Sequence, residues 1–141
     1  MSVTPHFPVQ SNLYCRPVFA VRDMTAAILY YLAALDFQHD WSVPPDAEVP
    51  VCAQVSRGTT QLLLWTEPTI ARPGRVYISL EFEDELQPLY EEFVSKQARA
   101  TSPPAPRLWG PSGFVVEDLD GNQLYFVSHP PMPLLPSELA E

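Results

Sequence analysis

The sequence predicts an α+β fold made of two βαβββ modules, because the chain contains an internal repeat. The segment Phe19–Asp23 (FAVRD) precedes a helical pattern, and Leu80–Asp84 (LEFED) precedes a second one. Further along each half, Thr60–Leu64 (TQLLL) corresponds to Asn122–Phe126 (NQLYF). Each half therefore reads as a strand, a helix and three strands.

The hairpin expected over Trp109–Val127 is the third observation. Phe114 and Val116 alternate with Val115 and Glu117, which is the period of a strand. The loop Asp118–Asn122 (DLDGN) follows, with side chains that bond the local backbone and a glycine that tolerates positive φ. A second β-prone segment then closes the hairpin.

The first module begins with a strand over Tyr14–Arg22, in which Pro17 indicates an edge position. Asp23 is the expected N-cap of a helix over Met24–Leu35. The helical spacing predicts a buried stripe formed by Ile28, Leu32 and Leu35. Three further strands are expected over Phe37–Val43, Val49–Ser56 and Thr60–Thr66.

The second module repeats this order after a Pro-containing linker. A strand is expected over Arg75–Glu83, and Asp84 is expected to cap a helix over Glu85–Ala98. The apolar face of that helix consists of Leu86, Leu89, Tyr90 and Phe93. The Pro-rich segment Arg99–Leu108 has room for one irregular strand. We expect one structural domain divided into an N-terminal arm (1–13), a first module (14–67), a linker (68–74), a second module (75–129) and a Pro-rich tail (130–141).

Charge and composition limit the function classes. The 17 acidic residues exceed the 8 Lys and Arg, which gives a net charge of −9 and argues against nucleic-acid binding. The longest helix-like apolar run, Ala26–Leu35, is too short to cross a bilayer, and no signal peptide is visible. We therefore expect a cytoplasmic protein without a membrane partner, in which Cys15 and Cys52 are reduced thiols.

The motif at the hairpin, Trp109-Gly110, Phe114 and Asp118-x-Asp120-Gly121-Asn122, resembles a family pattern. The pattern, WG-x-x-x-F-x-V-x-D-P-D-G-N, is that of the vicinal oxygen chelate superfamily, which includes glyoxalase I, extradiol dioxygenases and the fosfomycin- and bleomycin-resistance proteins. Leu119 replaces its usual proline. Pro17-Val18, Phe37–Trp41 and Leu89–Phe93 are most similar to the bleomycin-resistance branch. The resemblance implies the glyoxalase/bleomycin-resistance fold, in which curved mixed sheets surround a cavity, and a homodimer.

The resemblance also identifies where metal-using members bind their ion. They place a His, Gln or Glu seven residues before each capping Asp, and a Glu in the last strand of each module. This chain has poor divalent ligands at the four positions: Arg16, Leu63, Tyr77 and Tyr125. The histidines, His6, His39 and His129, lack metal-ligand spacing and are expected to be solvated or structural. We therefore expect neither a metal nor another cofactor.

Strand alternation predicts which side chains line the groove between the modules. Val76, Ile78, Leu80 and Phe82 should pack on the helix. The side chains expected to face the groove are Arg16, Val18, Ala20, Gln61, Leu63, Trp65, Tyr77, Ser79, Glu81, Glu83, Gln123, Tyr125 and Val127. By the resemblance, Trp41 and Trp109 flank the groove and stack on a ligand. Aromatic walls favour a flat ligand and carboxylates favour a cationic one, unless the glutamates lie at a solvated rim and the aromatics serve core or dimer packing.

Three functions remain open at this stage. The first is binding and sequestration of an antibiotic or other natural product, as in the bleomycin-resistance branch, and we favour it. The second is a metal-free enzyme in which Tyr77 or Tyr125 donates a proton and Glu81 or Glu83 acts as the base. The third, a metal-dependent lyase, isomerase or dioxygenase, is the least favoured because the ligands are missing. No Gly-rich phosphate loop, Gly-x-Ser-x-Gly or Cys-x-x-Cys motif is present.

Overall fold

The computed structural model describes residues 13–70, 72–107 and 110–128. The expected N-terminal arm up to residue 12 and the expected tail lie outside these residues, as do Trp109, His6 and His129. The elements in chain order are β1 (Val18–Val21), α1 (Met24–Ala33), β2 (Gln38–Val43), β3 (Cys52–Arg57), β4 (Thr60–Thr66), β5 (Arg75–Leu80), η1 (Glu83–Glu85), α2 (Leu86–Ser95), β6 (Arg99–Ala100), β7 (Ala105–Arg107), β8 (Gly110–Glu117) and β9 (Gln123–Ser128).

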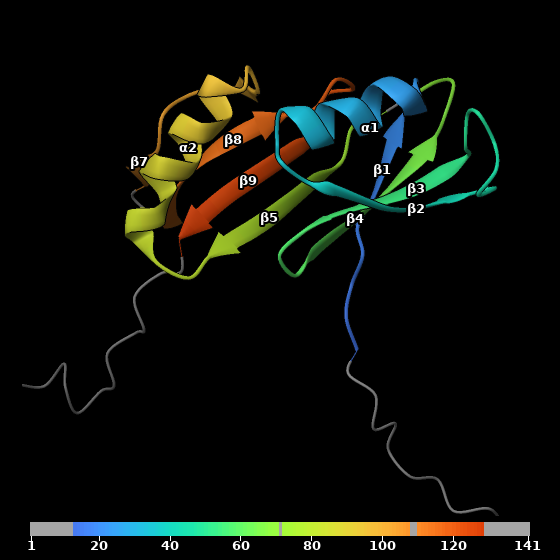
Figure 1. The fold of residues 1–141 in the computed structure, drawn as a ribbon. Coiled ribbons are helices and arrows are strands. Elements are labelled where there is room, and N and C mark those ends of the chain that lie inside the picture. Colours follow the sequence, from blue (N-terminus) through green and yellow to red (C-terminus); the bar gives the residue numbers. More distant parts are fainter. Residues whose placement is uncertain (1–12, 71, 108–109, 129–141) are drawn as a thin grey trace, which may run out of the picture.

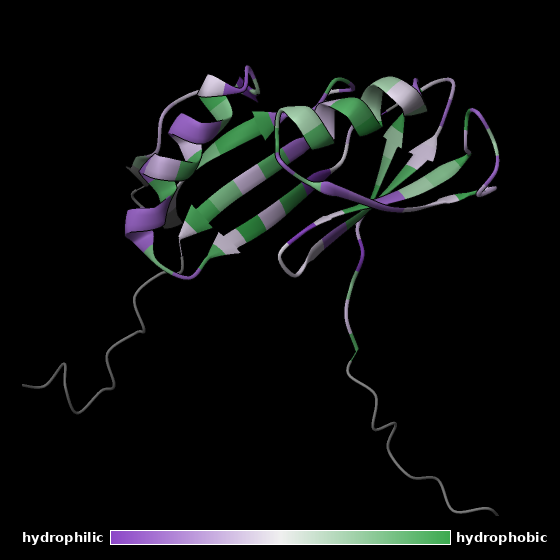
Figure 2. Ribbon diagram, in the orientation of Figure 1, coloured by the Kyte–Doolittle hydropathy of each residue, from purple (hydrophilic) through white to green (hydrophobic). Residues whose placement is uncertain are grey.

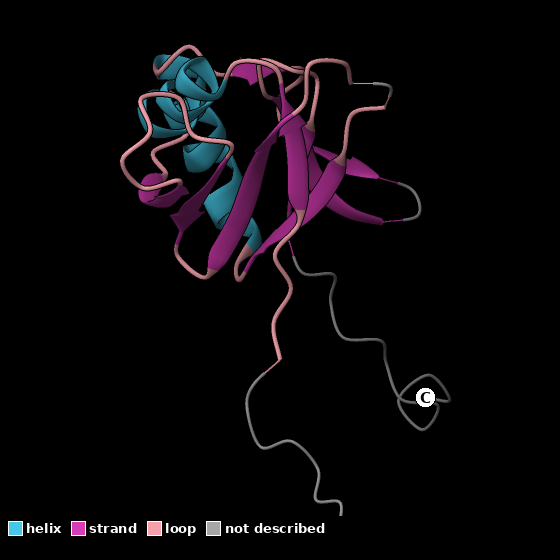
Figure 3. Ribbon diagram, turned by 90° about the vertical axis from the view of Figure 1, so that its right-hand side faces the viewer, coloured by secondary structure: helices cyan, strands magenta, loops and turns pink. Residues whose placement is uncertain are grey.

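The strands form two mixed sheets, one from each half of the chain, so the predicted fold class is confirmed. The first sheet has the order β1-β4-β3-β2, and the second has the order β5-β9-β8-β6, with β7 also paired to β8. In both sheets the first and last strands of the module, β1 with β4 and β5 with β9, are parallel. Figure 1 shows the two sheets next to each other, and Figure 3 shows both helices gathered on one side of the molecule.

Helix α1 begins where the sequence predicts. The Asp23 carboxylate accepts a hydrogen bond from the Ala26 amide at 3.0 Å, which is an N-cap bond. Its fully buried side chains are Met24, Ala27 and Tyr31, rather than the expected stripe. Within that stripe, Ile28 and Leu32 are only partly buried, and Leu35 is buried beyond the end of the helix. Because α1 is apolar on most sides, periodicity alone does not select the face that packs.

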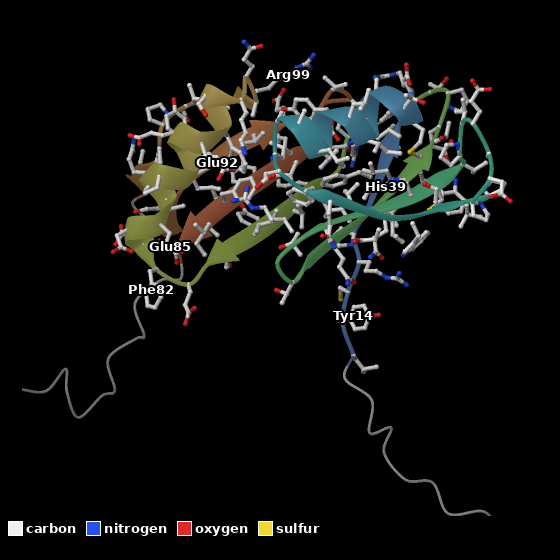
Figure 4. The ribbon with its side chains drawn as sticks, in the orientation of Figure 1. Tyr14, His39, Phe82, Glu85, Glu92 and Arg99 are labelled. Carbon is white, nitrogen blue, oxygen red and sulfur yellow. The ribbon has the colours of Figure 1, made fainter. Side chains whose placement is uncertain are left out.

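The connection from β5 to α2 differs from the prediction. Strand β5 ends at Leu80, three residues early, and the short η1 helix precedes α2. Asp84 lies inside η1 and does not cap α2. The Phe82 amide donates to the Glu85 carboxylate at 3.1 Å, which turns the chain away from the sheet. Phe82, expected to pack on the helix, is therefore 59% exposed and projects outward (Figure 4).

One hydrophobic core extends across both modules. The alternation predicted for β5 is present, since Val76, Ile78 and Leu80 pack against the core, and Figure 2 shows alternating apolar and polar bands along this strand. In the second module, the Phe114 and Phe126 rings stack at 5.4 Å between centroids. The helices cover only this side of each sheet.

The hairpin loop joins the two modules. Asp118, only 1% exposed, accepts hydrogen bonds from the Tyr31 hydroxyl and the Asn122 amide, both at 2.9 Å. Asn122 Nδ2 in turn donates to the Ala20 carbonyl at 3.0 Å, and the Arg22 amide donates to Asp120 at 3.0 Å. Burial raises the pKa of Asp118, although these hydrogen bonds act in the opposite direction. The polar residues of this loop therefore have a structural role that fixes the two sheets relative to each other.

Candidate functional site

Each sheet has a face that no helix covers, and the strand register identifies its residues. Residues opposite each other in register point to the same face of a sheet. The first open face consists of Arg16, Val18, Ala20, Trp41, Val43, Cys52, Gln54, Ser56, Gln61, Leu63 and Trp65. The second open face consists of Arg75, Tyr77, Ser79, Val115, Glu117, Gln123, Tyr125 and Val127.

The first open face is largely apolar, and its two tryptophans are solvent-exposed although Cys52, Gln54 and Ser56 are buried. Trp41 is 38% exposed and Trp65 is 44% exposed, values that are high for so large an apolar side chain. One row across the sheet runs from Val18 through Leu63 and Gln54 to Trp41. Exposed apolar surface of this kind marks a binding site for a ligand or a partner.

A polar network crosses the same face. Arg16 Nη1 donates to Gln54 Oε1 at 3.0 Å, and Gln54 Nε2 donates to Asp40 at 2.9 Å. A register shift between His39 and Trp41 accompanies this placement of Asp40, which also accepts bonds from Ser56 and Gln38. Desolvation raises the pKa of Asp40, but the bonds from Gln54, Ser56 and Gln38 outweigh it, so the pKa is lowered and the group is a carboxylate at neutral pH.

The second open face contains two tyrosines and an arginine in contact. The rings of Tyr77 and Tyr125 lie 5.0 Å apart between centroids, tilted by 40°. The Arg75 guanidinium lies 5.0 Å from the centre of the Tyr125 ring, and Arg75 Nε donates to Gln123 Oε1 at 3.2 Å. Tyr77 is 57% exposed, so its ring is available to a ligand.

The two predicted acidic groove residues do not lie on a strand. Glu81 and Glu83 follow the end of β5, so strand alternation no longer determines the direction of their side chains. Glu83 instead accepts a hydrogen bond from the Ser112 hydroxyl at 3.0 Å. The structure thus groups Arg16, Trp41, Leu63 and Trp65 on one face and Tyr77, Ser79 and Tyr125 on the other, without the two glutamates.

The side chains at the four family metal positions do not fit a divalent ion. Arg16 is a cation bonded to Gln54, and Leu63 is a hydrocarbon. Tyr77 and Tyr125 are stacked phenols that would each have to lose a high-pKa proton. Among the described residues, no group of three His, Cys, Asp or Glu side chains is placed to hold a metal ion.

Cys52 and His39 have structural surroundings. Cys52 is buried between the positions of Trp65 and Val43, and burial raises the pKa of its thiol, which makes it a weak nucleophile. His39 Nε2 is hydrogen-bonded to the Ser42 hydroxyl at 2.5 Å.

A separate cavity of about 710 Å³ lies between the β3–β4 turn and α2. Its walls are Phe37, Arg57, Gly58, Thr59, Thr60, Ile78, Ser79, Leu80, Asp84, Glu85, Pro88, Leu89, Glu92 and Phe126. Of the residues expected to bind ligand, Ser79 lies in this wall. Arg57 and Glu92 form a bidentate ion pair across it, at 2.7 and 3.1 Å.

Sequence reasoning missed several polar residues of the open faces. The alternation that selects Tyr77 also selects Arg75, and the central strand β3 contributes Gln54 by the same rule. No sequence pattern indicates Asp40, because the position of its side chain depends on the register shift between His39 and Trp41 in β2.

Comparison with known proteins agrees with this fold. The family model for the Glyoxalase/Bleomycin resistance protein/Dioxygenase superfamily matches residues 15–126. A glyoxalase/bleomycin resistance protein/dioxygenase from Nocardioides has a TM-score of 0.66 at 18% identity, over 91% of this chain and 93% of that one. A superfamily member from Sphaerobacter thermophilus has a TM-score of 0.63 at 23% identity, over 84% and 98%.

A third similar structure is the bleomycin-binding protein of Streptomyces verticillus, which was solved with copper(II)-bleomycin. Its TM-score is 0.67 at 20% identity, over 86% of this chain and 100% of that one. No curated protein sequence matches the chain. No helix within the described ranges is long and apolar enough to span a bilayer.

Proposed function

The chain belongs to the glyoxalase/bleomycin resistance protein/dioxygenase superfamily, and on this premise we propose that it binds and sequesters a flat small organic molecule without converting it. The observation that carries this proposal is the exposure of aromatic side chains on the open faces: Trp41, Trp65 and Tyr77. Such rings offer large, rigid contact area to a planar ligand. The bleomycin-binding protein of similar fold supports the ligand class, an antibiotic or similar natural product.

Sequestration is favoured over catalysis by the chemistry of the open faces. Arg16 and Leu63 occupy positions where metal-using relatives place ligands, so a metal-activated substrate has no support. A metal-free mechanism would pair Tyr77 or Tyr125 with Glu81 or Glu83, yet both glutamates lie beyond β5. Glu117 does share the strand face of the tyrosines, but it pairs with Gln123 and lies diagonal to Tyr125 rather than opposite it.

Fluorescence titration with metal-free bleomycin and a panel of planar aromatic natural products tests the proposal. Because Trp65 is exposed on the first open face, Trp65→Ala should weaken binding by about 1 kcal/mol or more. Leu29→Ala is the matched control, since Leu29 is 60% exposed on α1, on the covered side of the sheet. The Leu29→Ala variant should bind the ligand with the same affinity as the unmodified chain.

Mass spectrometry of the recovered ligand separates the two functions. An unchanged mass is expected. A product that forms with the unmodified chain and disappears in Tyr77→Phe would assign a metal-free enzyme instead. Failure of every planar compound to bind would refute the proposal.

A further inference from the structure

Each open face has an arginine that bonds a glutamine and lies near a tyrosine ring, although the glutamines belong to non-equivalent strands, β3 and β9. In the first module, Arg16 Nη1 donates to Gln54 Oε1 at 3.0 Å, and the guanidinium carbon lies 5.9 Å from the centre of the Tyr14 ring. In the second, Arg75 donates to Gln123 Oε1 at 3.2 Å and lies 5.0 Å from the Tyr125 ring. Each guanidinium is thus oriented by an amide oxygen and supported by an aromatic ring.

Within the described part of the chain, neither arginine pairs with a carboxylate, although the chain has 17 acidic residues against 8 basic ones. The ion pairs within the described residues involve Arg22, Arg57 and Lys96. An amide oxygen directs a guanidinium without cancelling its charge. Arg16 and Arg75 are therefore cations without a carboxylate partner among the described residues, on faces that also present aromatic rings.

The acidic groups near these arginines are Asp40 and Glu117. Asp40 contacts Gln54 rather than Arg16, and its oxygens already accept bonds from Gln54, Ser56 and Gln38. Glu117 lies opposite Gln123 in the register, one strand further from Arg75. Both carboxylates are separated from the guanidiniums by a glutamine.

A guanidinium has five N–H donors in a planar fork, and each of these two uses one donor on its glutamine. The remaining donors match the paired oxygens of a carboxylate or phosphate. We infer that Arg16 and Arg75 are anchors for anionic groups, carboxylate or phosphate, on the aromatic ligand of the open faces. This inference rests on the proposed function and replaces the cationic ligand expected from Glu81 and Glu83.

Equilibrium dialysis with a series of naphthalene probes tests the inference. The probes are 2-naphthoate, 2-naphthyl phosphate, the neutral 2-naphthalenemethanol and the cation N-methylquinolinium. At least one anion should bind roughly tenfold more tightly than the neutral probe, and the advantage should shrink with added salt. The tighter of the two anions identifies carboxylate or phosphate as the preferred group.

Four variants locate the effect. Arg16→Gln or Arg75→Gln should abolish most of the anion's advantage while leaving affinity for the neutral probe unchanged. Arg16→Lys keeps the positive charge but loses the planar pair of guanidinium donors. This variant should retain only part of the anion's advantage in affinity. Lys96→Gln removes the same charge at the end of α2, where Lys96 lies 3.9 Å from Asp36, and should change nothing. Thermal unfolding verifies that each variant is folded.

The outcomes separate this inference from the proposed function. If the neutral probe binds but no anion binds better, or if N-methylquinolinium binds as tightly as the anions, the anchors are refuted and the proposed function stands. An anion preference that survives in both glutamine variants also refutes the anchors. If the neutral probe does not bind while an anion binds in an arginine-dependent way, the anchors stand and planar stacking is refuted.

Discussion

At the scale of single residues, the hydrogen bond between Tyr31 and Asp118 connects the modules. The Tyr31 hydroxyl donates to Asp118 Oδ2 at 2.9 Å, and both side chains are almost completely buried. Burial raises the pKa of Tyr31 well above its usual value, with the neighbouring Asp118 charge as a further cause, so the phenol remains a donor. Asp118 also accepts from Asn122 Nδ2, so loss of the tyrosine bond leaves it partly satisfied.

Tyr31→Phe should lower the free energy of unfolding by about 1–2 kcal/mol, because it deletes one buried bond to a carboxylate. Urea unfolding monitored by circular dichroism measures this. Tyr90→Phe is the matched control in the other helix, since Tyr90 is half-buried and no hydroxyl bond of it is found in the described part of the chain. A Tyr31→Phe change as small as that of Tyr90→Phe would show that the bond contributes nothing net.

At the scale of elements, an ion pair holds α2 against β3. Arg57 bonds both carboxylate oxygens of Glu92 and also donates to the Leu35 carbonyl at 2.9 Å. The two side chains are 32% and 30% exposed, so solvent screens the pair only in part. The hydrogen bond and charge of Arg57 lower the pKa of Glu92, although partial burial acts against them.

The sign of the pH dependence follows from this lowered pKa. The pair stabilises the folded state fully above the ordinary carboxyl pKa of about 4.3, and its contribution is lost as the pH falls through the lower folded value. Glu92→Gln should therefore cost about 1 kcal/mol at neutral pH, and the cost should shrink as the pH falls below the ordinary carboxyl pKa. Urea unfolding at a series of pH values checks this.

Glu91→Gln is the control for that measurement. Glu91 is the adjacent residue on α2, is exposed, and accepts a hydrogen bond from Gln87 Nε2 at 3.2 Å. Its effect should stay below about 0.5 kcal/mol. A cost of Glu92→Gln that is equal at pH 3 and pH 7 would contradict the charge-based explanation.

The elements that sequence could predict are those specified by local chemistry. Asp23 caps α1, Gly121 adopts φ +85° in the hairpin loop, and the apolar spacing of Leu86 and Phe93 marks the buried side of α2. The end of β5 was not predictable, because β-prone residues continue to Phe82. The strand instead ends at Leu80, and reciprocal hydrogen bonds between Phe82 and Glu85 begin the short η1 helix.

The residues of the candidate site were likewise predictable only where local sequence patterns specify them. Strand alternation predicted that Trp65 and Tyr77 lie on the sheet faces away from the helices, and the observed strand register places them there. The Arg16–Gln54 contact, 38 residues apart, and the Arg57–Glu92 pair, 35 residues apart, depend on how strands and modules meet. No local pattern encodes such contacts, and the cavity beside Arg57 escaped prediction for the same reason.

At the scale of the whole molecule, the open faces leave apolar surface without cover. On the first open face, Val18 is 56% exposed and Val43 is 51% exposed, next to the two tryptophans. Monomers rarely expose contiguous apolar patches of this kind, and a twofold partner covers the same patch on both chains. We therefore predict a homodimer that buries part of the first open face, with about 800 Å² covered on each chain.

Light scattering after size exclusion should give twice the 15.8 kDa mass of the chain. Val18→Glu places a charge in the patch and should return the protein to the monomer mass, because burying an unpaired carboxylate costs more than the contact contributes. Leu29→Glu makes the same change at an equally exposed leucine on α1 and should leave the dimer intact. A dimer that Leu29→Glu separates and Val18→Glu does not would place the interface on the helices. A monomer mass for the unmodified chain would leave the open faces wholly available to ligand and refute the prediction.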